Sequence, residues 1–389
     1  MPLSRILVGL VVVIAVTSGV HWYLWSRLVR DAALPAPWFR VLTVAMIVLA
    51  ASLPVALLAS RGLPRFWGSL LAWPAYVWMG VMFFLFVALV PLDLARGLWT
   101  LVPSGDAAVD PARRTFLARV ASGMAALVAT SFAGVGLASV LRDVAVKRVP
   151  VTLARLPKHL SGYTIVQLTD IHVGPTIGKD FIEQLVASAN ALQPDMIAIT
   201  GDLVDGSVAA LGAFVEPLRN LRAKDGVYFV TGNHEYYSGA PEWIAFLGTL
   251  GIRVLRNEHV RIRGDEGFDL AGVDDATAHQ FGLGHGMDME SVNRDRDRER
   301  LLVLLAHQPK AIVTAEPHGV DLQLSGHTHG GQLFPFNFLV KLQQPYVAGL
   351  YEHGRAKVYV SAGTGYWGPP MRVGAPAEIT RIELVSGSA

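Results

Sequence analysis

The sequence predicts an α/β domain that follows an all-α membrane region. Two patterns point to this organisation: long apolar segments fill the first part of the chain, and from Val149 short runs rich in Val and Ile alternate with amphipathic segments. Apolar residues make up 52% of the 389 residues and charged residues 16%, against about 25% charged in soluble domains. We therefore expect a transmembrane region over residues 1–148 and an α/β domain over residues 149–389.

Four segments of the first region are long enough to cross a bilayer, which takes about 20 apolar residues. We predict transmembrane helices at about 6–25, 41–58, 70–90 and 120–141. None of these segments contains an Asp, Glu, Lys or Arg residue that would mark an ion or proton path. Transport is therefore not the expected function.

The orientation of these helices depends on the residues that flank the fourth segment. Arg113 and Arg114 lead into an Ala-, Gly- and Ser-rich stretch that resembles a twin-arginine export signal, which is read from the cytoplasm. Basic residues between Arg142 and Lys158 favour the opposite orientation, but long domains translocate largely regardless of such charges. We predict a multi-pass protein of the bacterial inner membrane whose C-terminal half is extracytoplasmic.

Composition narrows the choice of partners. The net charge of +2 is too small to suggest nucleic-acid binding, and no aromatic-and-basic recognition motif is present. With no cysteine, the chain uses neither disulfides nor thiolate chemistry. The oligomeric state is left open.

In the second region, the apolar runs have the length and composition of strands buried on both faces. We predict strands at 163–169, 196–200, 227–231, 301–306, 321–325 and 358–361, with helices after the first two. In such α/β architectures ligands bind beyond the carboxyl ends of the strands.

Polar motifs stand at these strand ends. They are Asp170-Ile-His172, Gly201-Asp202, Gly232-Asn-His-Glu235, His307 and Gly326-His-Thr-His329. Asp, His and Asn are oxygen and imidazole ligands that suit divalent Mn, Fe or Zn. Two such cations about 3.5–4 Å apart stabilise an in-line phosphoryl displacement and need a carboxylate between them. The motifs therefore predict a two-metal hydrolytic site.

The order of these motifs resembles the calcineurin-like metallophosphoesterases over about residues 156–384. The resemblance implies a four-layer α-β-β-α sandwich and two divalent metal ions, Mn²⁺, Fe²⁺/Fe³⁺ or Zn²⁺. It also implies the role of each motif residue: Asp170, His172 and His329 hold the first metal, Asp202 bridges, Asn233, His307 and His327 hold the second metal, and His234 contacts the substrate as general acid.

More narrowly, the stretches 201–206 and 326–332 and the Gly363-Thr-Gly365 turn are similar to the YkuE and YaeI branch of this family and its relatives with N-terminal transmembrane helices. This similarity implies a membrane-anchored phosphoesterase that cleaves a phosphodiester or pyrophosphate. A lipid-linked substrate such as UDP-2,3-diacylglucosamine is one candidate, although a cytosolic lipid substrate conflicts with an extracytoplasmic site. A phosphomonoesterase or protein phosphatase, and a metal-binding membrane sensor without catalysis, remain alternatives.

Several further residues allow two interpretations each. Asp205 either orients a ligand histidine or forms a turn, Glu235 either orients His234 or is exposed at a helix start, and Arg372 either contacts phosphate or forms a surface ion pair. The run 294–300 is expected to be a solvated helical face. Five aromatic residues form either an apolar rim for an acyl or nucleoside group or part of the core: Phe334, Phe336, Tyr346, Tyr366 and Trp367.

Overall fold

The computed structural model describes residues 3–99, 101 and 110–387, with the side chains of the first helix described from residue 11. The chain divides into two compact units, one of residues 1–138 and 368–371 and the other of residues 139–367 and 372–389. Strand β1 (Ala145–Leu153) opens the second unit, so the predicted boundary at 148/149 falls inside this strand.

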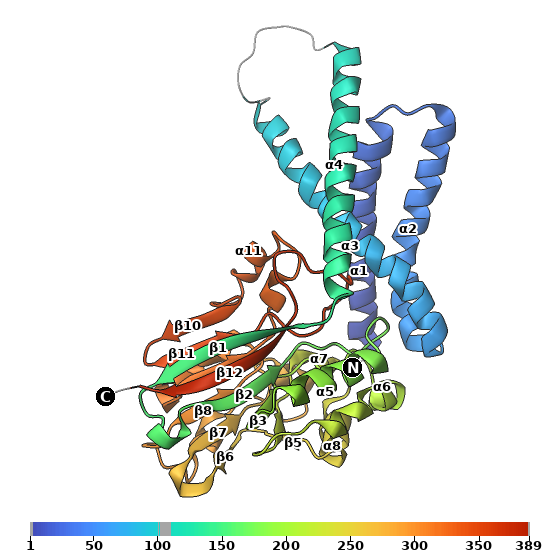
Figure 1. Ribbon diagram of the computed structural model, residues 1–389. Coiled ribbons are helices and arrows are strands. Elements are labelled where there is room, and N and C mark those ends of the chain that lie inside the picture. Colours follow the sequence, from blue (N-terminus) through green and yellow to red (C-terminus); the bar gives the residue numbers. More distant parts are fainter. Residues whose placement is uncertain (1–2, 100, 102–109, 388–389) are drawn as a thin grey trace. The chain divides into compact units, whose positions relative to one another are not determined.

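The first unit is helical (Figure 1). Its elements are α1 (Leu3–Trp25), the π-helical turn η1 (Ser26–Arg30), α2 (Ala36–Gly62), α3 (Arg65–Trp99) and α4 (Pro111–Val140). Among the described residues, α2, α3 and α4 are long and apolar enough to cross a membrane. The first predicted segment, 6–25, coincides with α1, whose first side chains lie outside the described residues. The helices start earlier than the predicted segments because polar residues continue the backbone hydrogen bonds while hydropathy marks only the apolar interior.

Several ionisable groups of this unit have partners inside it. The His21 ring receives a hydrogen bond from Trp78 Nε1 at 2.8 Å, and its other nitrogen lies 2.7 Å from the Thr17 carbonyl. Arg27 pairs with Asp93 at 2.8 Å, outside the apolar segments predicted from sequence. These contacts account for the polar side chains as connections between helices.

The second unit contains two six-stranded sheets, drawn as arrows in Figure 1. The first sheet has the order β1-β12-β2-β3-β4-β5 and the second has the order β10-β11-β9-β8-β7-β6. The strands after β1 are β2 (Tyr163–Leu168), β3 (Met196–Ile199), β4 (Val227–Phe229), β5 (Arg253–Val254), β6 (Glu258–Ile262), β7 (Phe268–Gly272), β8 (Leu302–Leu305), β9 (Leu322–Ser325), β10 (Gly349–His353), β11 (Ala356–Val360) and β12 (Glu378–Ser386).

Helices cover the outer faces of both sheets: α5 (Lys179–Ala191), α6 (Val208–Val215) and α8 (Ala240–Thr249) on the first, and α9 (Met289–Asn293) and α10 (Ile312–Ala315) on the second. Two short helices, α7 (Asn233–Ser238) and α11 (Asn337–Val340), lie in the connections after β4 and between β9 and β10. Short 3₁₀ helices complete the connections: η2 (Lys158–Leu160), η3 (Glu216–Asn220), η4 (Gly264–Glu266), η5 (Ala278–Phe281), η6 (Pro309–Ala311), η7 (Glu316–His318) and η8 (His329–Gly331).

Three apolar clusters define the layers of the sandwich. One lies between the sheets and joins residues of both, such as Ile165 of β2 and Leu324 of β9. Another packs the first sheet against α5, α6 and α8, and the third packs the second sheet against α9 and α10. In α5 the buried residues recur at helical spacing, so one face of this helix meets the sheet: Ile182, Leu185, Val186 and Ala189. The expected four-layer α-β-β-α arrangement is confirmed.

The parallel centre of each sheet matches the predicted strands. In the first sheet β2, β3, β4 and β5 run parallel, and in the second β7, β8, β9 and β11 run parallel. Of the antiparallel pairs β6–β7 and β10–β11, only β11 was predicted. The edge strands β6 and β10 have mixed burial and lack a continuous apolar run, and Asp269 interrupts the apolar run of the buried strand β7. The last strand, β12, lies between β1 and β2.

The expected helical face at 294–300 is wrong. Helix α9 ends at Asn293, and the run that follows is not helical. Arg296 is buried and Arg300 pairs with Asp269 at 2.9 Å, so buried ion pairing determines the structure of this segment. A run of alternating charges is typical of an exposed helical face, and the sequence alone does not reveal that some of these charges have buried partners.

Candidate metal centre

The carboxyl ends of parallel strands from both sheets carry the motif residues. Asp170 and His172 follow β2, Asp202 follows β3, and Asn233 follows β4 as the first residue of α7. From the second sheet, His307 follows β8, and His327 and His329 follow β9. Two sheets therefore supply side chains to one place, as expected for a site beyond the strand ends.

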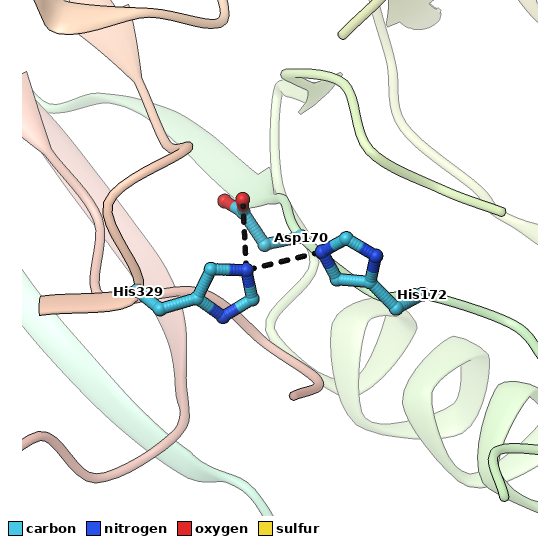
Figure 2. Close-up of side chains that lie close together, drawn as sticks. All are labelled: Asp170, His172 and His329. Carbon is cyan, nitrogen blue, oxygen red and sulfur yellow. Dashed lines mark hydrogen bonds and ion pairs between the residues drawn. The ribbon is translucent and has the colours of Figure 1, made fainter. Parts of the chain in front are cut away.

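The first group consists of Asp170, His172 and His329. Figure 2 shows these three side chains pointing toward one another. The Nε2 atoms of His172 and His329 are 3.0 Å apart, and His329 Nε2 lies 3.4 Å from Asp170 Oδ1. All three residues are buried, and their ligand atoms are close enough to hold one metal ion.

The second group consists of Asp202, His307 and His327. His307 Nε2 lies 3.1 Å from Asp202 Oδ2 and 3.2 Å from His327 Nδ1. These ligand atoms also fit around one ion. Asn233 lines the same cavity as His327.

Asp202 connects the two groups. Its Oδ2 atom is 3.1 Å from His307 Nε2 in the second group and 3.9 Å from His172 Nε2 in the first. A carboxylate between two cations offsets their mutual repulsion. The position of Asp202 is the one that a bridging ligand requires.

The backbone is strained at this site. Five motif residues have φ between 50° and 71°, which is uncommon for residues other than glycine: Asp170, His172, Asp202, His327 and His329. Such strain costs of order 1–3 kcal/mol per residue and clusters at functional sites. This strain supports a functional origin for the arrangement.

Two motif glycines make room for the carboxylates. A Cβ atom at Gly232 would overlap Asp202 Oδ1, and one at Gly326 would overlap Asp170 Oδ2 and Thr169 Oγ1. The backbone after β4 and after β9 can therefore approach the two carboxylates only where glycine precedes the ligand.

The donor set fits divalent cations. Asn233 Oδ1 is buried without a hydrogen-bond partner among the described residues, as expected for an oxygen that coordinates a metal. His307 Nδ1 lies 2.8 Å from the Thr200 carbonyl and His172 Nδ1 lies 3.1 Å from Asp205 Oδ1. Donation from Nδ1 fixes the tautomer and leaves Nε2 of each ring free to bind metal.

Burial and charge shift the ligand histidines in different directions. Burial lowers the pKa of His307, but Asp202 and Asp170 raise it to about 10, so this ring must give up a proton to bind a metal. Burial, with the nearby positive charge of His307, lowers the pKa of His327 to about 3. Burial likewise holds the pKa of His329 well below its usual value. Both rings are therefore neutral at physiological pH, the form that coordinates metal. Burial raises the pKa of Asp202, but the His307, His234 and His172 charges outweigh it and hold the pKa well below the usual range.

His234 lies at the edge of this centre. Its Nε2 atom is 4.0 Å from Asp202 Oδ2, and its Nδ1 atom is 2.6 Å from Asp205 Oδ1. Burial lowers the pKa of His234, but Asp202 and Asp205 together raise it to about 9. The ring can then carry a proton on Nε2, which faces the metal-ligand groups, while its Nδ1–H donates a hydrogen bond to Asp205.

Asp205 contacts two histidines with one oxygen. The predicted orientation of a ligand histidine is confirmed by the His172 contact, and the His234 contact is a second role that the sequence did not indicate. A third cluster, formed by His172, Asp205 and His234, also has ligand atoms close enough to surround a metal ion. In this cluster, however, the Asp205 carboxylate contacts the Nδ1 atoms of both rings. Hydrogen bonding explains this cluster better than a third ion.

Replacing Asp205 with Asn should lower kcat roughly 10- to 100-fold, the usual effect of losing such an orienting carboxylate. The neutral amide cannot accept strongly from both rings, so His172 and His234 lose their fixed orientation. The check is steady-state kinetics with metal content measured on the same sample. Asp180→Asn, an exposed carboxylate on α5, is the matched control. Equal activity of the two variants would remove Asp205 from the site.

Both sequence-based interpretations of Glu235 are wrong. This side chain is fully buried and accepts hydrogen bonds from the backbone N–H groups of Gly232, Asp202 and Leu203 at 2.7, 3.0 and 2.8 Å. Glu235 therefore joins the loops after β3 and β4, and it fixes the backbone of Asp202 rather than the ring of His234.

Arg372 is not a surface residue. It is buried and donates hydrogen bonds to the carbonyls of Gly365, His329 and Ala375 at 2.8, 3.3 and 2.9 Å. Burial lowers its pKa to about 10, so the guanidinium stays charged. Arg372 holds the His329 loop by its backbone, which excludes the expected surface ion pair.

The predicted aromatic rim divides into two sets. Tyr366 is buried and Tyr346 half-buried, as core packing requires. Phe334, Phe336 and Trp367 are exposed, which contradicts core packing for these three. The Trp367 ring lies 5.8 Å from the His234 ring, so this part of the rim borders the centre.

A cavity of about 370 Å³ opens beside the second group, a size within the ~300–1,000 Å³ typical of small-molecule sites. Its walls are polar: Asn233, Tyr237, Thr277, Gln308, Lys310, His327, Gln343 and Gln344. Gln344 donates to Gln308 at 3.3 Å, and Gln308 donates to Asp275 at 3.0 Å. The sequence did not indicate Lys310 or these amides, because they lie outside the motifs.

Comparison with known proteins gives consistent results. A sequence model described as calcineurin-like phosphoesterase matches residues 163–331. A Danio rerio protein described as a transmembrane protein with metallophosphoesterase domain is 35% identical over 383 residues, covering 93% of this chain and 85% of that protein. A Campylobacter jejuni protein described as an uncharacterized metallophosphoesterase is 32% identical over 379 residues, covering 96% and 97%.

Other relatives match a shorter part of the chain. Bacillus subtilis YkuE, also described as an uncharacterized metallophosphoesterase, is 30% identical over 285 residues, covering 70% of this chain and 98% of YkuE. A Bos taurus protein with the same description as the Danio relative is 43% identical over 274 residues, covering 67% of this chain and 62% of the bovine protein. Among solved structures, a Danio rerio dimetal phosphatase aligns with 12% identity and a TM-score of 0.36, covering 52% of this chain and 88% of that one.

These full-length similarities agree with the motif order and the site geometry. The chain belongs to the calcineurin-like metallophosphoesterase family and is a phosphoesterase hydrolase.

Proposed function

We propose that the protein is a membrane-anchored phosphoesterase with a dinuclear metal centre that hydrolyses a phosphodiester or pyrophosphate bond of a lipid-linked substrate. The observation that carries this proposal is the position of Asp202 Oδ2 between the two ligand groups. The candidate membrane helices support a substrate that is reached from the bilayer.

The proposed ligand sets follow from the two groups. Asp170, His172 and His329 hold one cation, Asn233, His307 and His327 hold the other, and Asp202 bridges. When bound, Mn²⁺, Fe²⁺/Fe³⁺ or Zn²⁺ ions in these sets would activate a water molecule and offset the charge of the scissile phosphate. The oxygen and imidazole ligands of these sets suit each of the three metals.

His234 is the proposed proton donor. Water gives one proton to the solvent and adds its oxygen to phosphorus, and the bond from phosphorus to the leaving oxygen breaks. The proton on His234 Nε2 passes to that oxygen and is replaced from the solvent. Asp205 holds the Nδ1–H of the same ring, which keeps Nε2 directed toward the centre. A site that only binds metal has no use for this proton donor, which disfavours the sensor alternative.

The polar cavity suits the head of such a substrate. Amides and hydroxyls of Gln308, Gln344 and Thr277 are hydrogen-bonded among themselves and to Asp275, so the wall is ordered before a ligand arrives. Lys310 makes no ion pair with a carboxylate among the described side chains. It lines the same cavity as the metal-ligand candidate His327, where its charge can meet an anionic group next to the scissile phosphate. The second phosphate of a pyrophosphate fits this environment.

Lys310→Met should therefore reduce kcat/KM for a pyrophosphate diester roughly 10- to 100-fold, since a charge-assisted hydrogen bond contributes about 1.5–3 kcal/mol. For bis-p-nitrophenyl phosphate, which lacks the second phosphate, kcat/KM should change little. Parallel kinetics on both compounds measure the difference. Lys179→Met, on the exposed face of α5, is the control. An equal loss on both compounds would reject the assigned contact.

Substrate class is tested by comparing matched esters. Purified full-length protein with added Mn²⁺ should hydrolyse bis-p-nitrophenyl phosphate faster than p-nitrophenyl phosphate. A preference for the monoester would instead support the phosphomonoesterase or protein phosphatase alternative. Bound metal with no hydrolysis of any ester would support the sensor.

We further propose that the protein is a multi-pass protein of the bacterial inner membrane with its second unit outside the cytoplasm. The pair Arg113 and Arg114 at the start of α4 supports this orientation. Reporter enzymes fused to the C-terminal end give the test. A reporter active only in the periplasm should work, and activity of a cytoplasm-only reporter would reverse the orientation.

A further inference from the structure

An apolar segment follows the last ligand motif. This segment, residues 334–342, contains five large apolar side chains that are exposed: Phe334, Phe336, Phe338, Leu339 and Leu342. Leu342 is 81% exposed. A contiguous exposed apolar surface of this kind marks a site of interaction with a protein or a membrane.

The backbone of the apolar segment is hydrogen-bonded locally. The N–H groups of Phe338 and Leu339 bond to the carbonyls of Pro335 and Phe336, and those of Lys341 and Gln343 bond to the carbonyls of Asn337 and Val340. Phe334 is tied to Val373 by a 2.9 Å backbone bond. Backbone groups with internal partners enter an apolar medium without the cost of losing water.

The apolar segment carries one positive charge and no negative charge. Lys341 is its only charged residue, and the sequence contains no Asp or Glu between His327 and Glu352. The Lys341 ammonium lies 6.0 Å from the centre of the Phe338 ring. A long lysine side chain at the edge of an apolar surface can extend its charge to lipid headgroups while its stem stays in the apolar layer.

The segment is continuous with the candidate site. It begins five residues after His329 and ends beside Gln343 and Gln344, which line the polar cavity. Gln344 accepts a hydrogen bond from Lys310 N at 3.1 Å, so the end of the segment is fixed to the cavity wall. Whatever contacts the apolar segment is therefore also next to the cavity.

We propose that the apolar segment inserts into the interfacial layer of the bilayer. The candidate membrane helices of the same chain would tether the second unit to a bilayer, and tethering lowers the apolar contact needed for docking. Insertion brings the polar cavity to the level of lipid headgroups and selects phosphoesters carried by membrane lipids. This inference rests on the membrane anchoring in the proposed function and is independent of the chemical step.

The absence of cysteine from the chain permits a site-specific test. Three variants carry one cysteine each. Leu342→Cys reports on the apolar segment, Asp265→Cys replaces a 91% exposed side chain of the second unit, and Ile47→Cys lies in α2. Each full-length variant is labelled with an environment-sensitive fluorophore and reconstituted in nanodiscs of phosphatidylethanolamine and phosphatidylglycerol. Emission is measured with a lipid-attached quencher and, separately, with a water-soluble quencher.

The labels at residues 342 and 47 should each lose more emission with the lipid-attached quencher than with the water-soluble quencher. The label at residue 265 should show the opposite preference. Loss at residue 342 mainly to the water-soluble quencher overturns the proposal. Protection from both quenchers also overturns it, because the segment then packs against protein rather than lipid. A water-quenched label at residue 47 shows instead that membrane anchoring has failed. Hydrolysis of bis-p-nitrophenyl phosphate by the Leu342→Cys protein confirms its fold.

Discussion

Asp202→Asn should abolish hydrolysis, reducing kcat/KM by at least ~10³-fold, because removing one negative charge from between two cations forfeits several kcal/mol of electrostatic stabilisation. The amide has the same shape, and its oxygen can still accept the 2.9 Å hydrogen bond from His234 N. The fold should therefore persist while the second cation is lost. Elemental analysis should find two metal ions per wild-type chain and fewer in the variant.

The control for this variant is Asp265→Asn, which removes the same charge from an exposed position of the same unit. Its activity and metal content should equal those of the wild type. If Asp202→Asn kept both ions and full activity, the dinuclear assignment would be wrong, because no other described carboxylate lies within 4 Å of histidines from both groups.

His234→Gln should show a loss that depends on the leaving group. For an ester whose leaving oxygen becomes a poorly stabilised alkoxide, kcat should fall about 10²- to 10⁴-fold, the usual contribution of a positioned general acid. For p-nitrophenolate, which leaves without needing a proton, the loss should be much smaller. Both ions should remain bound, since His234 Nε2 points toward the centre from its edge, 4.0 Å from the bridging carboxylate.

His279→Gln, an exposed histidine of η5, is the matched control and should have wild-type kinetics with both esters. A uniform loss for His234→Gln across leaving groups would assign this ring to substrate binding rather than to proton donation. Loss of metal from this variant would place it among the ligands.

Sequence reasoning placed the motif residues at strand ends because the strands that lead into them are buried on both faces. The runs that became β2, β3, β8 and β9 are continuous apolar stretches, and polar residues at their ends are conspicuous. The edge strands β5 and β6 have mixed burial and gave no such pattern. Motifs are therefore easiest to interpret where the surrounding sequence is most uniformly apolar.

The charged residues that support the centre could not be assigned in this way. Glu235 and Arg372 are buried because backbone groups satisfy them, some near in sequence and others, such as Asp202 N and the His329 carbonyl, more than thirty residues away, and no local pattern predicts a backbone partner. Arg296 was misinterpreted for the same reason, since its environment includes Asp269 of β7. Asp205 was predicted in part, because its position three residues after Asp202 suggested one histidine and the fold supplied two.

The place of β12 in the first sheet has a consequence for biosynthesis. This strand comes after every other described strand in the sequence, yet it pairs over nine residues with β1 and also borders β2, which are the first two strands of the unit in chain order. Until β12 has been synthesised, β1 and β2 have no strand between them, and the first sheet cannot close. A truncation that removes β12 would therefore expose unpaired edges of β1 and β2 to proteases or to aggregation.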